Sequence, residues 1–64
     1  MVWKKISETR HEAVGTHGKF IIERSKGLWW SRWWNETSMF RMPPKRKLSE
    51  AKEMCEENIH WEDR

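Results

Sequence analysis

The residues best suited to chemistry in this chain are three histidines and one cysteine. His11 and His17 lie in a polar stretch without the spacing of a zinc motif. Cys55 and His60 are five positions apart, which does not bring them to one face of a helix. His11 and Glu12 have the types of an acid–base pair, but no nucleophile is marked beside them. We therefore predict no metal ligand, no cofactor and no catalytic residue, and a protein that is not an enzyme.

A phosphate-binding loop is the other chemical motif to consider. Residues 15–19, Gly-Thr-His-Gly-Lys, supply glycines and a lysine but lack the spacing and the Ser/Thr of that loop. We expect a turn here instead. Cys55 lies on the apolar stripe of a predicted helix, so we expect it to be a buried small hydrophobe.

Length and composition limit the kind of protein. A chain of 64 residues allows one domain with a marginal core. A single cysteine excludes an internal disulfide and suits a reducing compartment. No apolar run approaches the roughly 20 residues of a membrane span, and Met1 leads into Val2-Trp3-Lys4-Lys5, which is not a signal segment. We therefore expect a cytoplasmic protein that does not contact a membrane.

Charge is divided unevenly along the chain. Residues 1–47 carry eleven Lys/Arg and four Glu, which is +7, whereas residues 48–64 carry two Lys/Arg and six Glu/Asp, which is −4. The basic part indicates an acidic or polyanionic partner. Alternatively, the acidic segment offsets the basic one within the monomer.

Strand patterns occupy the N-terminal part of the chain. The predicted strands cover residues 2–6, 19–24, 28–34 and 38–42. Gly27 supplies the positive φ that a hairpin turn at 25–27 requires. We expect residues 7–18 to form a loop, and Pro43-Pro44 to end the sheet because proline cannot donate to the ladder.

The apolar period changes to that of a helix from Leu48 onward. The apolar stripe consists of Leu48, Ala51, Cys55 and Ile59. Ser49 or Lys47 would occupy the N-cap. The predicted fold is α+β, a small three- to four-stranded antiparallel sheet packed on one C-terminal helix. It forms a single domain over 1–64, with the sheet at 1–42, a basic connector at 43–47 and the helix at 48–60.

One helix covers one side of a sheet, so the other side should be free. We expect Phe20 and Ile22 to point inward. The next strand buries either Trp29 and Trp33 with Ser31, or Trp30 and Trp34 with Arg32. Burying a serine requires one hydrogen bond, whereas burying an arginine requires a paired charge. We therefore predict a core that contains Trp29, Trp33, Phe40 and Met42.

The free face then collects aromatic, methionine and arginine side chains, as interface hot spots do. The predicted partner-binding residues are Lys19, Ile21, Trp30, Arg32, Trp34, Met39 and Arg41. Arg32 is two residues from each exposed tryptophan, within stacking reach of either. Alternatively, these tryptophans pack on the loop at 7–18, on Trp3 or across a homodimer.

The order of motifs resembles many short uncharacterised phage and prophage proteins. The shared order is an N-terminal Trp, then Gly-Lys-Phe-Ile-Ile at 18–22, a tryptophan strand, Phe40, and Leu-Ser-Glu-Ala-Lys at 48–52. The resemblance implies a phage setting and a sheet-plus-helix fold, and it implies no activity. At the level of fold alone, the topology resembles the arm-binding domains of phage integrases and plant ethylene-response DNA-binding domains.

Two functional hypotheses follow. The first is a phage-type inhibitor or adaptor that docks its Trp/Arg-rich sheet face on a host protein or protein complex in the host cytoplasm, for example a CRISPR effector or another defence complex. The second is a nucleic-acid-binding module, in which exposed tryptophans stack on bases. In this second hypothesis the phosphate contacts come from Arg32, Arg41, Lys45, Arg46 and Lys47.

Overall fold

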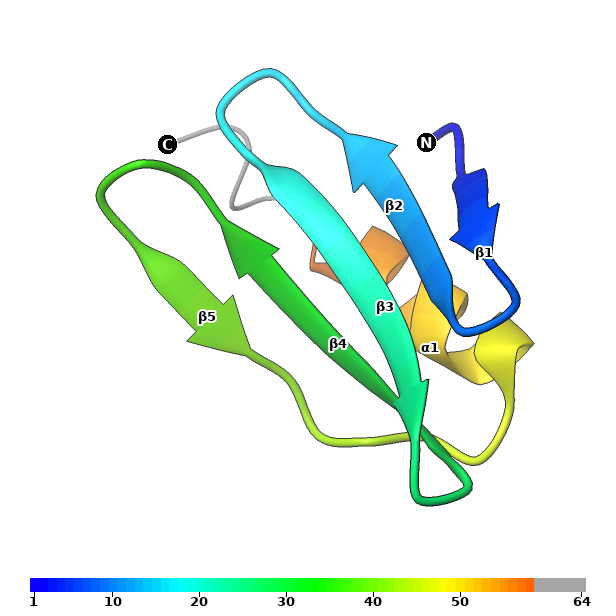
Figure 1. Cartoon of the computed structure of the whole chain (residues 1–64). Helices are drawn as coiled ribbons and strands as arrows, with labels where there is room; N and C mark the ends of the chain where they lie inside the picture. Colours follow the sequence, from blue (N-terminus) through cyan, green and yellow to red (C-terminus); the bar gives the residue numbers. More distant parts are fainter. Residues whose placement is uncertain (59–64) are drawn as a thin grey trace.

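The computed structural model describes residues 1–58. They form a five-stranded antiparallel meander, in which each strand pairs with the next along the chain (Figure 1). The strands are β1 (Lys4–Ser7), β2 (Arg10–Val14), β3 (Lys19–Ser25), β4 (Leu28–Trp34) and β5 (Met39–Arg41). One helix, α1 (Leu48–Glu57), follows the sheet. The α+β class predicted from the sequence is confirmed.

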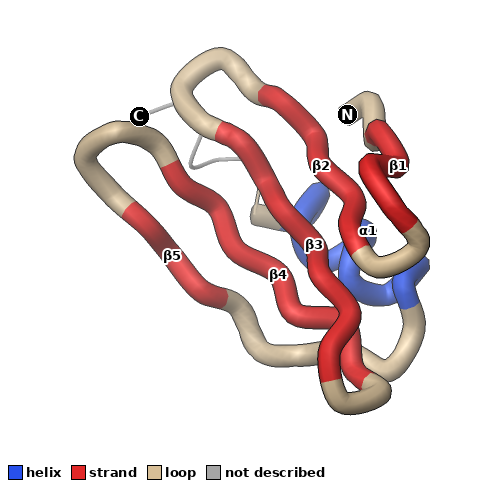
Figure 2. The backbone as a smooth tube through the Cα atoms, in the orientation of Figure 1, coloured by secondary structure: helices blue, strands red, loops and turns tan. Residues whose placement is uncertain are grey.

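The helix covers one side of the sheet. It packs on β3 and β4, and it lies behind the strands in Figure 1. A connector runs from β5 past the start of β4 to reach it (Figure 2). The buried core between helix and sheet consists of Phe20, Ile22, Trp33, Met42, Ala51 and Cys55. Within residues 1–58 the opposite side of the sheet carries no helix, and we call it the outer face.

The core prediction holds in most of its members. Trp33 and Met42 are buried, and Trp29 packs on the core while remaining partly exposed. Phe40 differs, since it is 41% exposed, although its ring lies 5.7 Å from that of Trp33. The difference follows from its position on the edge strand β5, which the helix does not contact closely.

The predicted loop over 7–18 is wrong for its central residues. Strand β2 occupies this stretch and pairs with both β1 and β3. Its inward residues are His11 and Ala13, both buried. Neither belongs to the β-branched and aromatic residues typical of strands, so pairing with two neighbours outweighs their weak propensity.

A tight turn joins β3 to β4. Lys26 has φ 54° and Gly27 has φ 75°, so both central residues are in the left-handed region. This is the pattern of a type I′ hairpin turn, whose twist matches that of the paired strands. The expected role of Gly27 is confirmed, and Lys26 adopts the same unusual conformation without being glycine.

The helix begins where the periodicity predicts. Its N-cap is Lys47, and no side chain caps it by a hydrogen bond. Ile59 and His60, which the prediction included, lie outside the described residues. In the described part of the chain, no helix has both the length and the apolar character needed to cross a membrane.

Candidate functional site: the outer face of the sheet

Strand alternation and register decide which side chains share the outer face. Phe20, Ile22 and Trp33 point to the helix, so their neighbours along β3 and β4 point away from it. The outer face therefore carries Lys4, Arg10, Glu12, Val14, Lys19, Ile21, Glu23, Trp30, Arg32, Trp34, Met39 and Arg41. All seven of the predicted partner-binding residues lie on it.

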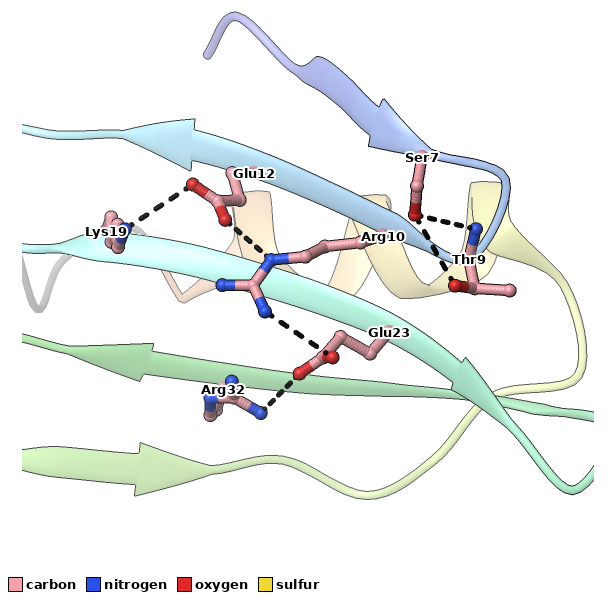
Figure 3. Close-up of polar contacts among 7 residues, drawn as sticks. All are labelled: Ser7, Thr9, Arg10, Glu12, Lys19, Glu23 and Arg32. Carbon is pink, nitrogen blue, oxygen red and sulfur yellow. Dashed lines mark hydrogen bonds and ion pairs between the residues drawn. The ribbon is translucent and has the colours of Figure 1, made fainter.

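Five charged side chains cross the middle of this face in one connected row, which we call the ion ladder. Glu12 joins Lys19 Nζ at 3.4 Å and Arg10 Nε at 2.7 Å through its two carboxylate oxygens. Glu23 joins Arg10 Nη1 at 3.5 Å and Arg32 Nη1 at 2.8 Å. Figure 3 shows the alternation of acid and base from β2 across β3 to β4. The ion pair with Glu23 therefore restrains the position of the Arg32 side chain.

The formal charges of the ladder do not cancel. The hydrogen bond from Arg10, together with the nearby Lys19, holds the pKa of the Glu12 carboxyl below its usual range. Three cations then meet two carboxylates, so the ladder keeps one net positive charge. Partly exposed pairs of this kind contribute little stability each, about 0–1 kcal/mol. Their main effect here is to fix the directions of the long side chains.

Ile21 lies on the predicted face but not at its surface. It is 1% exposed, and it sits in register between Glu12 on β2 and Arg32 on β4. Both belong to the ion ladder, whose aliphatic stems can cover an apolar side chain. Ile21 therefore packs beneath the ion ladder. Its side chain is not accessible to a partner as long as these ion pairs are formed.

Trp30 is exposed and yet fixed in direction. It is 42% exposed, and its indole Nε1 donates a hydrogen bond to the Ser25 carbonyl oxygen at 3.0 Å. This bond ties the ring to the end of the neighbouring strand. A large aromatic surface that is already ordered loses little conformational freedom when a partner covers it.

Trp34 occupies the other end of the same strand. The Lys19 ammonium lies 5.2 Å from its ring centroid. The ring borders a hollow of about 490 Å³ between the β2–β3 and β4–β5 turns, which lie at the same end of the sheet (Figure 1). Asn35 joins the two turns, because its amide nitrogen donates to the His17 carbonyl oxygen at 3.0 Å.

Neither Trp3 nor the segment at 7–18 covers Trp30 and Trp34, although the sequence left both alternatives open. Trp3 packs against the core on the helix side, and residues 10–14 form a strand in the plane of the sheet. The turn after β2 flanks Trp34 and leaves it partly exposed. The third alternative, in which a second copy of the chain covers these tryptophans, concerns an interface between two chains.

The basic connector is not part of the outer face. Lys45 pairs with Trp29 through two backbone hydrogen bonds of 2.7 and 2.9 Å. Paired residues project to the same side, so Lys45 faces the helix, where it shares a hollow with Glu50 and Glu53. Lys47 caps the helix and Arg46 is exposed between them. The structure brings Arg32 and Arg41 together but not with Lys45.

Arg10 and Glu12 belong to the outer face, and the sequence prediction missed both. They were expected in a loop, whereas strand β2 places them beside β3. The available signal was the alternation of Arg10, Glu12 and Val14 with His11 and Ala13. It is weak, because the inward residues of that pattern are small or polar.

Metal-binding groups and the cysteine are the next features of the described residues. Among residues 1–58, no three His, Cys, Asp or Glu side chains are grouped so that they could hold a metal ion. Burial raises the pKa of the Cys55 thiol to about 11, so little thiolate forms at neutral pH. The Ser31 hydroxyl lies beside that thiol and makes no hydrogen bond of ordinary geometry.

Comparison with known proteins adds no relative. No protein-family model, curated protein or solved structure matches the chain. Function therefore has to be inferred from the geometry of the outer face.

Proposed function

We propose that this chain is a non-enzymatic binding domain whose outer face docks on a protein partner. One observation carries the proposal: Trp30 is 42% exposed while its indole nitrogen is already hydrogen-bonded. Trp34 and Met39 extend the same surface, and Met39 is 53% exposed. Fixed aromatic side chains surrounded by arginine are the residues that dominate binding energy in protein interfaces.

In this proposal the domain acts as an inhibitor or adaptor that occludes a site on its partner. The resemblance to short phage proteins points to a host protein, with defence complexes as one class of target. The small size of the domain supports occlusion, because one side of its sheet is not covered by α1 and carries exposed side chains.

Charge distribution favours a protein over a nucleic acid as the partner. Glu12 and Glu23 lie in the middle of the face and already neutralise most of the ladder's cations. A nucleic acid would present regularly spaced phosphates to these carboxylates. Lys45 faces the acidic helix. It therefore does not extend the row of outer-face cations that a nucleic-acid backbone would contact.

A nucleic-acid partner remains the second candidate, because Arg32 and Arg41 are adjacent on the outer face while the acids of α1 lie on the other side. If it is correct, changing Lys45, Arg46 and Lys47 to Ala should weaken binding of a labelled duplex and lower its salt dependence. No duplex binding at low salt would remove this candidate.

The test of the proposal compares matched variants in a capture experiment. The tagged chain is incubated with a lysate of the host cell, with and without nuclease. Trp30→Ala and Trp34→Ala should lose a protein that wild type retains after nuclease treatment, since truncating a hot-spot aromatic costs about 2–4 kcal/mol of affinity. Phe40→Ala is the control, because Phe40 is equally exposed but lies on the other side of the sheet. Equal capture by all of these folded variants would contradict the proposal.

A further inference from the structure

Two arginines face each other across the last strand pair. Arg32 on β4 is directly opposite Arg41 on β5. Directly opposed side chains have Cβ atoms about 4.5–5.5 Å apart, and like charges at that distance are unfavourable. Glu23 neutralises part of Arg32, at 2.8 Å. Arg41 is exposed and forms no ion pair within residues 1–58. Within residues 1–58, the pair therefore carries positive charge that no ion pair fully compensates.

Arg32 and Arg41 are among the residues that line a small hollow. It measures about 190 Å³ and is lined by Trp30, Ser31, Arg32, Arg41 and Met42. We call it the arginine bay. Its origin is the end of the β4–β5 ladder: Met42 N donates to the Ser31 carbonyl at 3.0 Å, and the chain rejoins β4 only at Lys45 and Trp29. Pro43 and Pro44 lie between these points and supply no N–H, so the sheet cannot close there.

We infer that the arginine bay is an oxyanion site that seats an Asp or Glu carboxylate of the protein partner between Arg32 and Arg41, against the ring of Trp30. This inference rests on the proposed function, since it takes the partner to be a protein. A guanidinium presents parallel donors that match the two oxygens of a carboxylate. The bound anion would relieve the repulsion between the two arginines, and Trp30 would exclude water from one side of the contact.

A single carboxylate fits the bay better than a phosphate chain does. Glu23 holds the far side of Arg32, and Glu12 follows beyond Arg10. Phosphates adjacent to one bound in the bay would approach these carboxylates, whereas an isolated acidic side chain would not. The half-exposed Trp30 and Met39 near the bay also suit the apolar surface that surrounds an acidic residue in a protein interface.

The first test is direct binding of small anions, followed by NMR. Sodium acetate is titrated into the labelled chain against sodium chloride at equal ionic strength, which separates binding from screening. We expect acetate to shift the Nε–Hε signals of Arg32 and Arg41 and the indole N–H signal of Trp30. Arg41→Gln should abolish the shifts at Arg32 and Trp30. Arg46→Gln, which removes the same charge from another exposed position, should leave them unchanged.

The second test uses the captured partner. Arg41→Gln should weaken its binding by about tenfold or more, because a hydrogen-bonded charge is lost. Arg41→Lys should recover only part of the affinity, since lysine lacks the planar fork, and Arg46→Gln should bind as wild type. Thermal melts check that each variant folds. Arg41→Gln should melt no lower than wild type, because it removes a repulsion.

The outcomes separate the two proposals. Acetate shifts in Arg41→Gln equal to those in wild type would overturn the arginine bay. The arginine bay would also be overturned if Arg41→Gln bound the partner fully while Trp30→Ala and Trp34→Ala lost it. In that case the proposed function would stand. If inorganic phosphate and duplex DNA bind in an Arg41-dependent way and no nuclease-resistant protein is captured, the proposed function fails and the occupant of the bay is a phosphate.

Discussion

At the scale of single residues, the close contacts of Gly18 set the position of the core tryptophan. A Cβ built at this position would lie 2.6 Å from the Trp34 carbonyl oxygen and 2.7 Å from the Trp33 ring. One neighbour is backbone and the other is a buried ring, so neither can move cheaply. We predict that Gly18→Ala lowers the free energy of unfolding by about 1–3 kcal/mol, as overpacked cores do.

Urea denaturation measures this change directly. Gly15→Ala, in the same turn, is a comparison variant that separates clash from a general loss of backbone freedom, because Gly15 does not have a positive φ. A Gly18→Ala protein as stable as wild type would show that the Trp33 ring is not packed against the β2–β3 turn in solution.

The turn residue Lys26 offers a change in the opposite direction. Its φ of 54° is unfavourable for a lysine, whereas asparagine tolerates this region and is preferred at the first central position of type I′ turns. The side chain itself is exposed. We predict that Lys26→Asn raises the free energy of unfolding by about 0.5–1 kcal/mol. A decrease in the denaturation midpoint would show that the turn is not type I′.

At the scale of elements, strand β2 places a buried histidine against a tryptophan of β4. His11 is 7% exposed, and its ring meets that of Trp29 edge-on at 5.7 Å between centroids. Burial lowers the pKa of His11 from its ordinary value of 6.5, and the nearby Lys52 of α1 and Lys5 of β1 lower it further, while Glu8 opposes them. The folded protein therefore favours the neutral ring.

The sign of the pH effect follows from linkage. Below pH 6.5 the unfolded chain takes up a proton at His11 more readily than the folded one. The stability that His11 contributes is therefore complete above that pH and is lost as the pH falls toward the lowered value. The Glu12 carboxyl also has a lowered pKa, so its contribution is lost only in a more acidic range, below its ordinary value of 4.5.

We predict that wild type loses stability as the pH falls below 6.5 and that His11→Phe removes most of this loss. The aromatic replacement keeps the contact with Trp29 and cannot take up a proton. Urea melts at a series of pH values, in one buffer system, measure the slope. The same slope in both proteins would show that His11 does not control the stability in this range.

The same strand marks the limit of what the sequence could predict. β3 and β4 were predictable because they are runs of β-branched and aromatic residues bounded by turn signals, and α1 because its apolar residues recur at helical spacing. β2 was not, since its inward residues are His11 and Ala13 and its place in the sheet depends on pairing with β1 and β3 instead of on an apolar pattern of its own. Missing β2 had a consequence for the candidate site, because the ion ladder begins on Arg10 and Glu12 and covers Ile21.

At the scale of the whole molecule, the domain has two unlike sides. The acidic helix covers the side that contains Phe20, Ile22 and Trp33, and the cationic outer face is left open. The split of Trp30, Arg32 and Trp34 from Trp29 and Trp33 was predictable from the cost of burying an arginine without a partner. The arginine bay was not, since it depends on where the β4–β5 ladder stops.

This two-sidedness predicts opposite behaviour for tryptophans on the same strand. Trp33 is 3% exposed and belongs to the core, so Trp33→Ala should cost about 3–5 kcal/mol. A domain of this size has a stability of only a few kcal/mol, so that variant should be largely unfolded. Trp30→Ala loses one hydrogen bond and a half-exposed ring, so we expect a cost below about 1.5 kcal/mol.

Circular dichroism melts over a hundredfold range of protein concentration measure both variants and test the remaining alternative for the outer face. If a second copy of the chain covers Trp30, the melting temperature of wild type should rise with concentration, and Trp30→Ala should remove that dependence. For a monomer with an open face, we expect no dependence in either protein. A Trp30→Ala variant that unfolds as completely as Trp33→Ala, with a concentration-dependent wild type, would place the outer face inside a dimer rather than at a site for another protein.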